Sequence, residues 1–279
     1  MPSPKPSDIY GVVAEGTEGL LRGLVQSGDE KAGVASDLLE LGITRKETKR
    51  SVMVVPYGGT MRACLSYVEE ALQDKGLEIA IVDKDRRKQV KGLGAKAVWD
   101  AMEEPLGTAK ELMRYLQKAS RLLSKRNLGC NWTAPSGFPV SQRYMVQVAR
   151  KVQAGKTDGV KTSFVLLDDT GKVDGTRQAS GIAPNIVHSY DAAHMTLTVE
   201  RLAREEGVLD FALVHDSFGV HASHMPAMQR VLREVFLEIY SEDVPATLAA
   251  ELMYHDETEC PQLGTWEPES VLEADYFFS

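Results

Sequence analysis

The sequence is poor in cysteine and has no long apolar run, and both absences restrict what the protein can be. Its three cysteines, Cys64, Cys130 and Cys260, are odd in number and far apart, so a disulfide framework or a paired-cysteine metal site is not expected. The longest apolar runs, such as 52–55 and 211–214, are far too short to cross a bilayer. The first six residues lack the apolar core of a signal peptide, and we therefore expect a cytoplasmic protein with no membrane partner.

A positive net charge is also absent. The formal net charge of -8 at pH 7 argues against a generic nucleic-acid coat protein. Basic residues nevertheless gather at 45–50 and 84–91, where they could present a local groove to phosphates. At 279 residues, 43% hydrophobic and 26% charged, the chain has a globular composition and room for one large domain or two of ordinary size.

Residues 211–224 predict a β-hairpin with a polar tip. They read FALVHDSFGVHASH, in which two short apolar segments flank His215, Asp216 and Ser217. A carboxylate on a rigid hairpin suits Mg²⁺, which takes oxygen ligands and keeps part of its water shell. Two-metal phosphoryl chemistry ordinarily needs a second carboxylate that faces the first, so Asp216 would need a partner.

Residues 45 to about 55 predict a basic helix, with Thr44 as its N-cap. Arg45 and Lys49 stand four residues apart, as do Lys46 and Arg50, and like charges at that spacing repel one another. The pattern is compatible with a solvated basic face, and also with a clamp for a triphosphate or a nucleic-acid backbone.

Pro56 should kink or end this helix next to Tyr57, and Gly58 and Gly59 follow with little side-chain bulk. An aromatic ring beside bare backbone can stack on a base or a sugar. The alternative interpretation is a kink with a core tyrosine.

The remaining pattern predicts an α+β protein that is mainly α-helical. Helical patterns cover about 7–25 with Ser7 as N-cap, 35–41, 61–72, 225–240 and 245–254. Residues 83–126 also look strongly helical, with a basic entry, a segment at 95–102, a break at 105–107 and a further segment at 108–123. Residues 131–140 predict a β-hairpin, and 146–173 predict a protruding β-ribbon. The cations of this ribbon could enter a groove of DNA, or the ribbon could be a surface loop.

A helix from 180 to about 205 carries His188, Asp191 and His194 near its start. The three residues stand at positions i, i+3 and i+6, and side chains at this spacing do not all lie on one face of a helix. This spacing disfavours a zinc site. Polar contacts to a substrate or to the 211–221 hairpin are the favoured interpretation.

Taken in order, these segments resemble the single-subunit, phage-type DNA-directed RNA polymerases, which include mitochondrial enzymes. Residues 44–58, TRKETKRSVMVVPYG, resemble the fingers motif of that family. Residues 180–194, SGIAPNIVHSYDAAH, are similar to the segment that leads into the palm, and 214–219, VHDSFG, to the catalytic hairpin. Residues 131–140 and the ribbon resemble the region that holds the promoter-recognition loop. The resemblance implies a partial right-hand polymerase fold, with fingers helices and a palm hairpin.

The resemblance implies catalytic roles for two residues. Asp216 would ligate catalytic Mg²⁺, with His215 shaping the site. Lys49 would act on the triphosphate, with donation of a proton to the leaving pyrophosphate as an option.

The resemblance also implies a set of nucleotide-binding residues. Arg45 and Arg50 would hold phosphates. Tyr57, with Gly58 beside it, would stand at the sugar and help to select ribose over deoxyribose. His188 would orient the incoming or initiating nucleotide.

Part of the family's catalytic centre is not represented in these residues. The first palm motif, around the other metal-binding aspartate, should stand upstream of Ser7, and no other aspartate here lies in a matching context. We therefore expect a C-terminal portion of a polymerase that needs a complementing N-terminal polypeptide. Its partners would be a DNA template or promoter, ribonucleoside triphosphates with Mg²⁺, and the RNA product.

The expected regions are 1–129 for the fingers helices, 130–178 for the ribbon, and 179–279 for the palm portion and tail. The expected location is the cytoplasm of a phage-infected host cell, with a mitochondrial location as the less favoured alternative. Two alternatives remain open. One is a catalytically inactive remnant that binds nucleic acid through 45–50 and 84–91, and the other is a related DNA polymerase palm.

Overall fold

The computed structural model describes residues 8–157, 160–214, 216–252 and 260–277. Its helices and strands are α1 (Ile9–Gln26), α2 (Ala32–Leu41), α3 (Arg45–Met53), η1 (Val55–Tyr57), α4 (Met61–Asp74), α5 (Leu77–Ala80), α6 (Lys84–Ala101), α7 (Glu103–Lys125), β1 (Cys130–Thr133), β2 (Pro139–Gln142), β3 (Met145–Thr157), β4 (Val160–Val173), α8 (Gly175–Glu206), β5 (Ala212–Val214), β6 (Ser217–Gly219), η2 (Ala222–His224), α9 (Met225–Tyr240), α10 (Val244–Leu252) and α11 (Ser270–Glu273). Helices predominate, as the sequence predicted. The described residues contain no helix long and apolar enough to cross a membrane.

The chain divides into two compact units, which we describe one at a time. The first comprises the described parts of 1–113, 229–241 and 263–279, and the second 114–228 and 242–262. The three regions predicted from the sequence are defined by function, and their boundaries at 129 and 178 stay a prediction.

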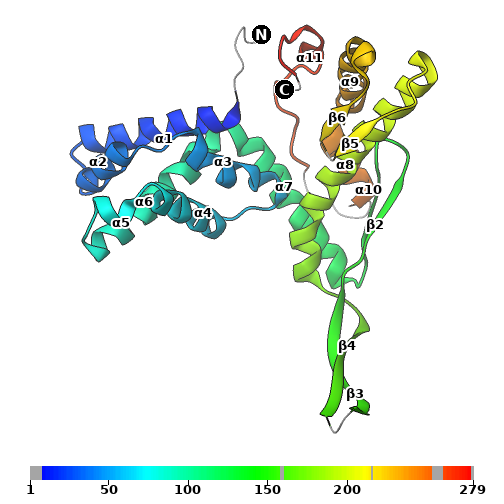
Figure 1. Ribbon diagram of the computed structural model, residues 1–279, viewed down its shortest axis with the longest axis horizontal. Coiled ribbons are helices and arrows are strands. Elements are labelled where there is room, and N and C mark those ends of the chain that lie inside the picture. Colours follow the sequence, from blue (N-terminus) through cyan, green and yellow to red (C-terminus); the bar gives the residue numbers. More distant parts are fainter. Residues whose placement is uncertain (1–7, 158–159, 215, 253–259, 278–279) are drawn as a thin grey trace. The chain divides into compact units, whose positions relative to one another are not determined.

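The first unit is built around a helical core. Helix α1 packs against α2, α3 and α6, and α4 packs against α6, as the blue-to-cyan part of Figure 1 shows. The apolar faces of these helices bury a common cluster of side chains, among them Val13, Leu21, Leu38, Val52, Val68, Leu72 and Val98. This burial of apolar surface holds α3 against α1.

The second unit contains three separate two-stranded antiparallel sheets, β1–β2, β3–β4 and β5–β6. The predicted hairpin, ribbon and polar-tipped hairpin are thereby confirmed, and the long ribbon is visible in Figure 1.

Two buried glutamines join β2 to α8 in this unit. Gln142 Nε2 donates to the backbone oxygen of Gln178 at 2.9 Å, and Gln178 Nε2 donates to the backbone oxygen of Gln142 at 3.0 Å. Because their amide groups satisfy each other and the backbone, these polar groups can be buried at low cost.

Several predicted helix boundaries were wrong, among them those of α1, α7 and α8. Helix α1 is capped by Asp8, whose side chain accepts from two backbone N–H groups, and does not begin at Ser7. The break predicted at 105–107 lies earlier, at Met102, because Pro105 occupies the first turn of α7, where its missing N–H has no helical partner. Helix α8 begins at Gly175, capped by Asp174, and continues through Pro184, so His188 lies near its middle.

Candidate functional site

Helix α3, which carries the predicted phosphate-binding cations, begins in a capping box formed by the exposed Thr44 and the buried Glu47. The Glu47 carboxylate accepts from Thr44 N at 2.8 Å and from Thr44 Oγ1 at 2.6 Å, and it pairs with Lys75 Nζ of the segment after α4 at 3.0 Å. Glu47 is only 3% exposed. Desolvation is the largest influence on this carboxyl and would raise its pKa, but the hydrogen bonds from Thr44 and Lys75 together lower the pKa below its ordinary value.

Replacing Glu47 by alanine is expected to lower the free energy of unfolding by about 2–3 kcal/mol, because the cap and the partner of Lys75 are both lost. The folded-state pKa of Glu47 is depressed, so its stabilisation is present above the ordinary glutamate pKa and is lost as pH falls through the folded value. Urea denaturation from neutral to acidic pH should therefore show the gap between wild type and Glu47→Ala closing on acidification. Glu18→Ala is the control, since its exposed pair with Arg22 contributes less than about 0.5 kcal/mol.

The cations of α3 divide between two sides of the helix. Arg45 and Lys49 lie over the ring of Tyr10, with Arg45 Cζ at 5.3 Å and Lys49 Nζ at 5.8 Å from its centroid. Arg50 instead pairs with Glu70 at 2.6 Å and lies 5.3 Å from the ring of Tyr67. A phosphate role for Arg50 would require it to leave this pair, and that role stays a prediction.

Two glycines shape the backbone after Tyr57. Gly58 has φ +86°, in the left-handed region that glycine tolerates best. A Cβ on Gly59 would lie 2.7 Å from the backbone oxygen of Val54, so no larger residue fits without movement of the chain. Tyr57 is 39% exposed at the end of this turn, which favours the stacking platform over a core tyrosine.

Asp216 lies exposed at the turn of the β5–β6 hairpin. The register pairs Val214 with Ser217 and Leu213 with Phe218, so the turn contains two residues, 215 and 216. His215 lies outside the described residues, and its role stays a prediction. The hairpin contacts α8 through Phe218, whose ring meets the ring of buried His194 edge-on at 5.7 Å.

Helix α8 also brings a second carboxyl group into the electrostatic range of Asp216. The pKa of the solvent-accessible Asp191 carboxyl is raised, mainly by desolvation and further by the charge of Asp216, while His188 and His194 oppose the rise. This electrostatic link agrees with the interpretation that the polar residues of this helix face the hairpin or a substrate. His194 contacts the hairpin through its ring, while the predicted polar contacts of the α8 residues stay a prediction.

The oxygen chemistry of this region suits Mg²⁺, but the described residues do not complete a metal site. Among them, no group of three His, Cys, Asp or Glu side chains is arranged to hold a metal ion. Asp216 offers an exposed carboxylate at a turn, and Mg²⁺ commonly takes one or two carboxylates with water and substrate phosphates. The ion therefore fits Asp216 as one ligand of several.

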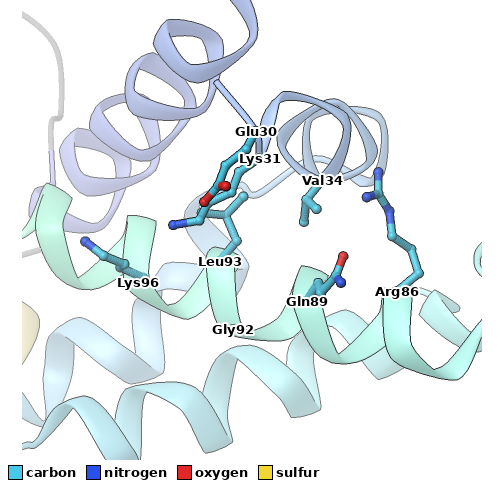
Figure 2. A pocket seen from close by; sticks show the side chains of 8 residues that line it. All are labelled: Glu30, Lys31, Val34, Arg86, Gln89, Gly92, Leu93 and Lys96. Atoms are coloured by element: carbon cyan, nitrogen blue, oxygen red, sulfur yellow. The ribbon is translucent and has the colours of Figure 1, made fainter. Parts of the chain in front are cut away.

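A separate cavity of about 460 Å³ lies between α2 and α6 and is lined by Lys31, Arg86 and Lys96 among others (Figure 2). Arg86 pairs with Asp37 at 2.7 Å, and Lys96 with Asp100 at 2.8 Å. Two of these three cations, Arg86 and Lys96, are already paired with carboxylates within the fold. The cavity therefore offers a phosphate less attraction than its cation count implies.

The structure thus places the predicted residues in two groups. Arg45, Lys49, Arg50, Tyr57 and Gly58 belong to the first unit. His188 and Asp216 belong to the second unit.

Sequence reasoning missed Asp8 and Tyr10, which contact Arg45 from the start of α1. No spacing signal links residues that are more than thirty positions apart in the chain.

The fold defines a mainly α-helical α+β protein, the class to which right-hand polymerases belong. The chain belongs to the DNA-dependent RNA polymerase family, whose family model matches residues 1–260, and its relatives are of the phage and organelle type.

Three curated relatives show the extent of the match. The DNA-directed RNA polymerase of Enterobacteria phage T3 is 29% identical over 100% of this chain and 36% of its own length. DNA-directed RNA polymerase 2A of Nicotiana tabacum is 29% identical over 99% of this chain and 82% of its own length. DNA-directed RNA polymerase 1, mitochondrial, of Nicotiana sylvestris is 30% identical over 99% of this chain and 27% of its own length. The chain therefore spans about a third of the length of the phage T3 relative.

Proposed function

We propose that this chain supplies the fingers and part of the palm of a DNA-directed RNA polymerase. It would transfer nucleotidyl groups from ribonucleoside triphosphates under the direction of a DNA template, by a two-metal mechanism. A second polypeptide would carry the other palm aspartate, and the phage relatives make the cytoplasm of a host cell the proposed location.

The exposure of Asp216 at a two-residue turn carries this proposal. A two-residue hairpin fixes the direction of a carboxylate more tightly than a long loop does, and the Phe218–His194 contact anchors the hairpin to α8. The segment 214–219 is also the one that resembles the family's catalytic hairpin.

The proposed chemistry assigns each group a task. Bound Mg²⁺ would stabilise negative charge on the phosphates as a 3′-hydroxyl attacks the α-phosphate. Asp216 would provide one carboxylate ligand for it. Lys49 and Arg45 would hold the triphosphate through charge-assisted hydrogen bonds and stabilise the charge that develops on the leaving pyrophosphate.

Two residues would position the nucleotide. Tyr57 would stand at the sugar, where its exposed ring can distinguish ribose from deoxyribose. His188, on α8, would orient the incoming or initiating nucleotide.

The proposal is tested by complementation. The full chain is mixed with the part of the phage T3 polymerase that lies upstream of the matching region, and extension of an RNA primer on a DNA template is measured with Mg²⁺ and ribonucleoside triphosphates. Extension is expected in the mixture and at less than a hundredth of that rate with either polypeptide alone, because each alone lacks one carboxylate.

Two other outcomes would replace the proposal. If the mixture binds the primed template but never extends it, the chain is a nucleic-acid-binding remnant. If extension requires deoxyribonucleotides, the chain belongs to a DNA polymerase.

A further inference from the structure

The ring of Tyr10 lies beneath two cations that both belong to α3. Arg45 Cζ is 5.3 Å and Lys49 Nζ is 5.8 Å from the ring centroid, within the range of a cation–π interaction. The two cations are four residues apart on one helix, where they would otherwise repel each other. One aromatic ring thus attracts both members of a like-charged pair.

Three hydrogen bonds fix Tyr10 and its surroundings in place. Asp8 Oδ1 accepts from the backbone N–H of Tyr10 at 2.9 Å, and the buried Thr48 hydroxyl donates to the backbone oxygen of Tyr10 at 2.8 Å. Asp8 Oδ2 accepts from Arg45 Nε at 2.6 Å, and this bond is the largest reason why the pKa of Asp8 is lowered. The backbone of Tyr10 is therefore tied to α3 through Thr48, and its neighbour Asp8 is tied to Arg45 of the same helix.

The three candidate phosphate-binding cations differ in whether a carboxylate neutralises their charge. Arg45 has the Asp8 carboxylate as a counter-ion, and Arg50 has Glu70. Within the described residues Lys49 has no ion pair, only the ring. An aromatic face attracts the ammonium group without neutralising it, so Lys49 keeps its full charge for an incoming anion.

We propose that Tyr10 is a positioning residue that holds Lys49 and Arg45 side by side, with Lys49 left unneutralised, to receive the phosphates of a triphosphate. This role rests on the proposed function, and it extends that function to a residue of α1. Asp8 assists by capping α1 and orienting Arg45.

The test measures the dissociation constant of the full chain for inorganic tripolyphosphate by calorimetry at low salt. Tyr10→Leu is expected to weaken binding about fivefold to tenfold, since both cation–π contacts are lost. Tyr10→Phe keeps the ring and is expected to bind within about twofold of wild type. Trp99→Leu is the matched control. Trp99 packs against the same core and makes a cation–π contact with Lys110, whose Nζ is 4.8 Å from the ring centroid. It is not part of the proposed phosphate clamp, which consists of Arg45 and Lys49.

A second series separates positioning from folding. Phenylalanine with increasing ring fluorination is placed at position 10, which weakens the ring's attraction for cations and leaves its shape nearly unchanged. The dissociation constant should rise stepwise with fluorination. A constant affinity across this series overturns the positioning role.

Lys49→Met separates the failure of this role from the failure of the proposed function. If Lys49→Met binds more weakly and affinity is constant across the fluorination series, Lys49 binds the phosphates as proposed but Tyr10 has no positioning role. Binding by Lys49→Met as tight as that of wild type, or no binding by wild type at millimolar tripolyphosphate, overturns the clamp and the role of Tyr10 together.

Discussion

Asp216→Ala is expected to reduce nucleotidyl transfer by the complemented enzyme about a thousandfold or more. A metal ion at a transferring phosphoryl group contributes several kcal/mol of transition-state stabilisation, and about 4 kcal/mol corresponds to a thousandfold in rate. Asp216 is exposed at a two-residue turn, so its removal should leave the core of the second unit unchanged. The measurement is the single-turnover rate of one ribonucleotide addition at saturating Mg²⁺.

Two further variants identify the cause of that loss. Asp216→Asn keeps the shape of the side chain and removes its charge, and it should be about as inactive as Asp216→Ala because a neutral amide is a weak ligand for Mg²⁺. Asp210→Ala removes an exposed aspartate just before β5 and should keep the wild-type rate. An Asp216→Asn enzyme with the wild-type rate would show that the carboxylate holds no catalytic ion.

Gly59→Ala is expected to lower the free energy of unfolding of the first unit by about 2–3 kcal/mol. Its Cβ would lie 2.7 Å from the backbone oxygen of Val54 and 2.8 Å from the backbone carbon. The Val54 oxygen accepts from Gly59 N at 2.8 Å and from Tyr57 N at 3.1 Å, so relief of the clash disturbs both bonds. Chemical denaturation of the two proteins measures the difference.

Gly19→Ala provides a control of opposite sign. Gly19 lies inside α1 with open space around its Cβ position, and alanine there should stabilise the helix by about 0.5–1 kcal/mol. If Tyr57 selects the sugar as proposed, the Gly59→Ala enzyme should also lose part of the proposed preference for ribonucleotides, because Tyr57 shares the disturbed turn. Stability and preference both equal to wild type would contradict the structure of this turn.

The local structure could be predicted from the sequence where short-range chemistry decides it. Thr44 followed by Glu47 is the pattern of a capping box, and both reciprocal bonds are present. The apolar segments around Asp216 gave the correct hairpin, because alternation and turn position are local signals. Pro105 was misread since proline ends a helix only outside the first turn, and the sequence did not reveal where that turn begins.

The tertiary environment of the predicted residues could not be predicted. The charge pattern of α3 gave the four-residue spacing of its cations but not their partners. The partners come from α1 and α4, as the Arg45–Asp8 and Arg50–Glu70 pairs show. Such pairs depend on how helices pack, and helix packing is set by apolar faces that leave the identity of neighbouring charges open.

The most direct test is the choice of nucleotide by the complemented enzyme on a primed DNA template. Each of the four template bases is offered in turn, with all four ribonucleotides and all four deoxyribonucleotides supplied separately, and the first addition is quantified. The proposed function predicts addition of the complementary ribonucleotide at each base, much faster than its deoxy counterpart. Additions that ignore the template base, or that favour deoxyribonucleotides, would contradict it.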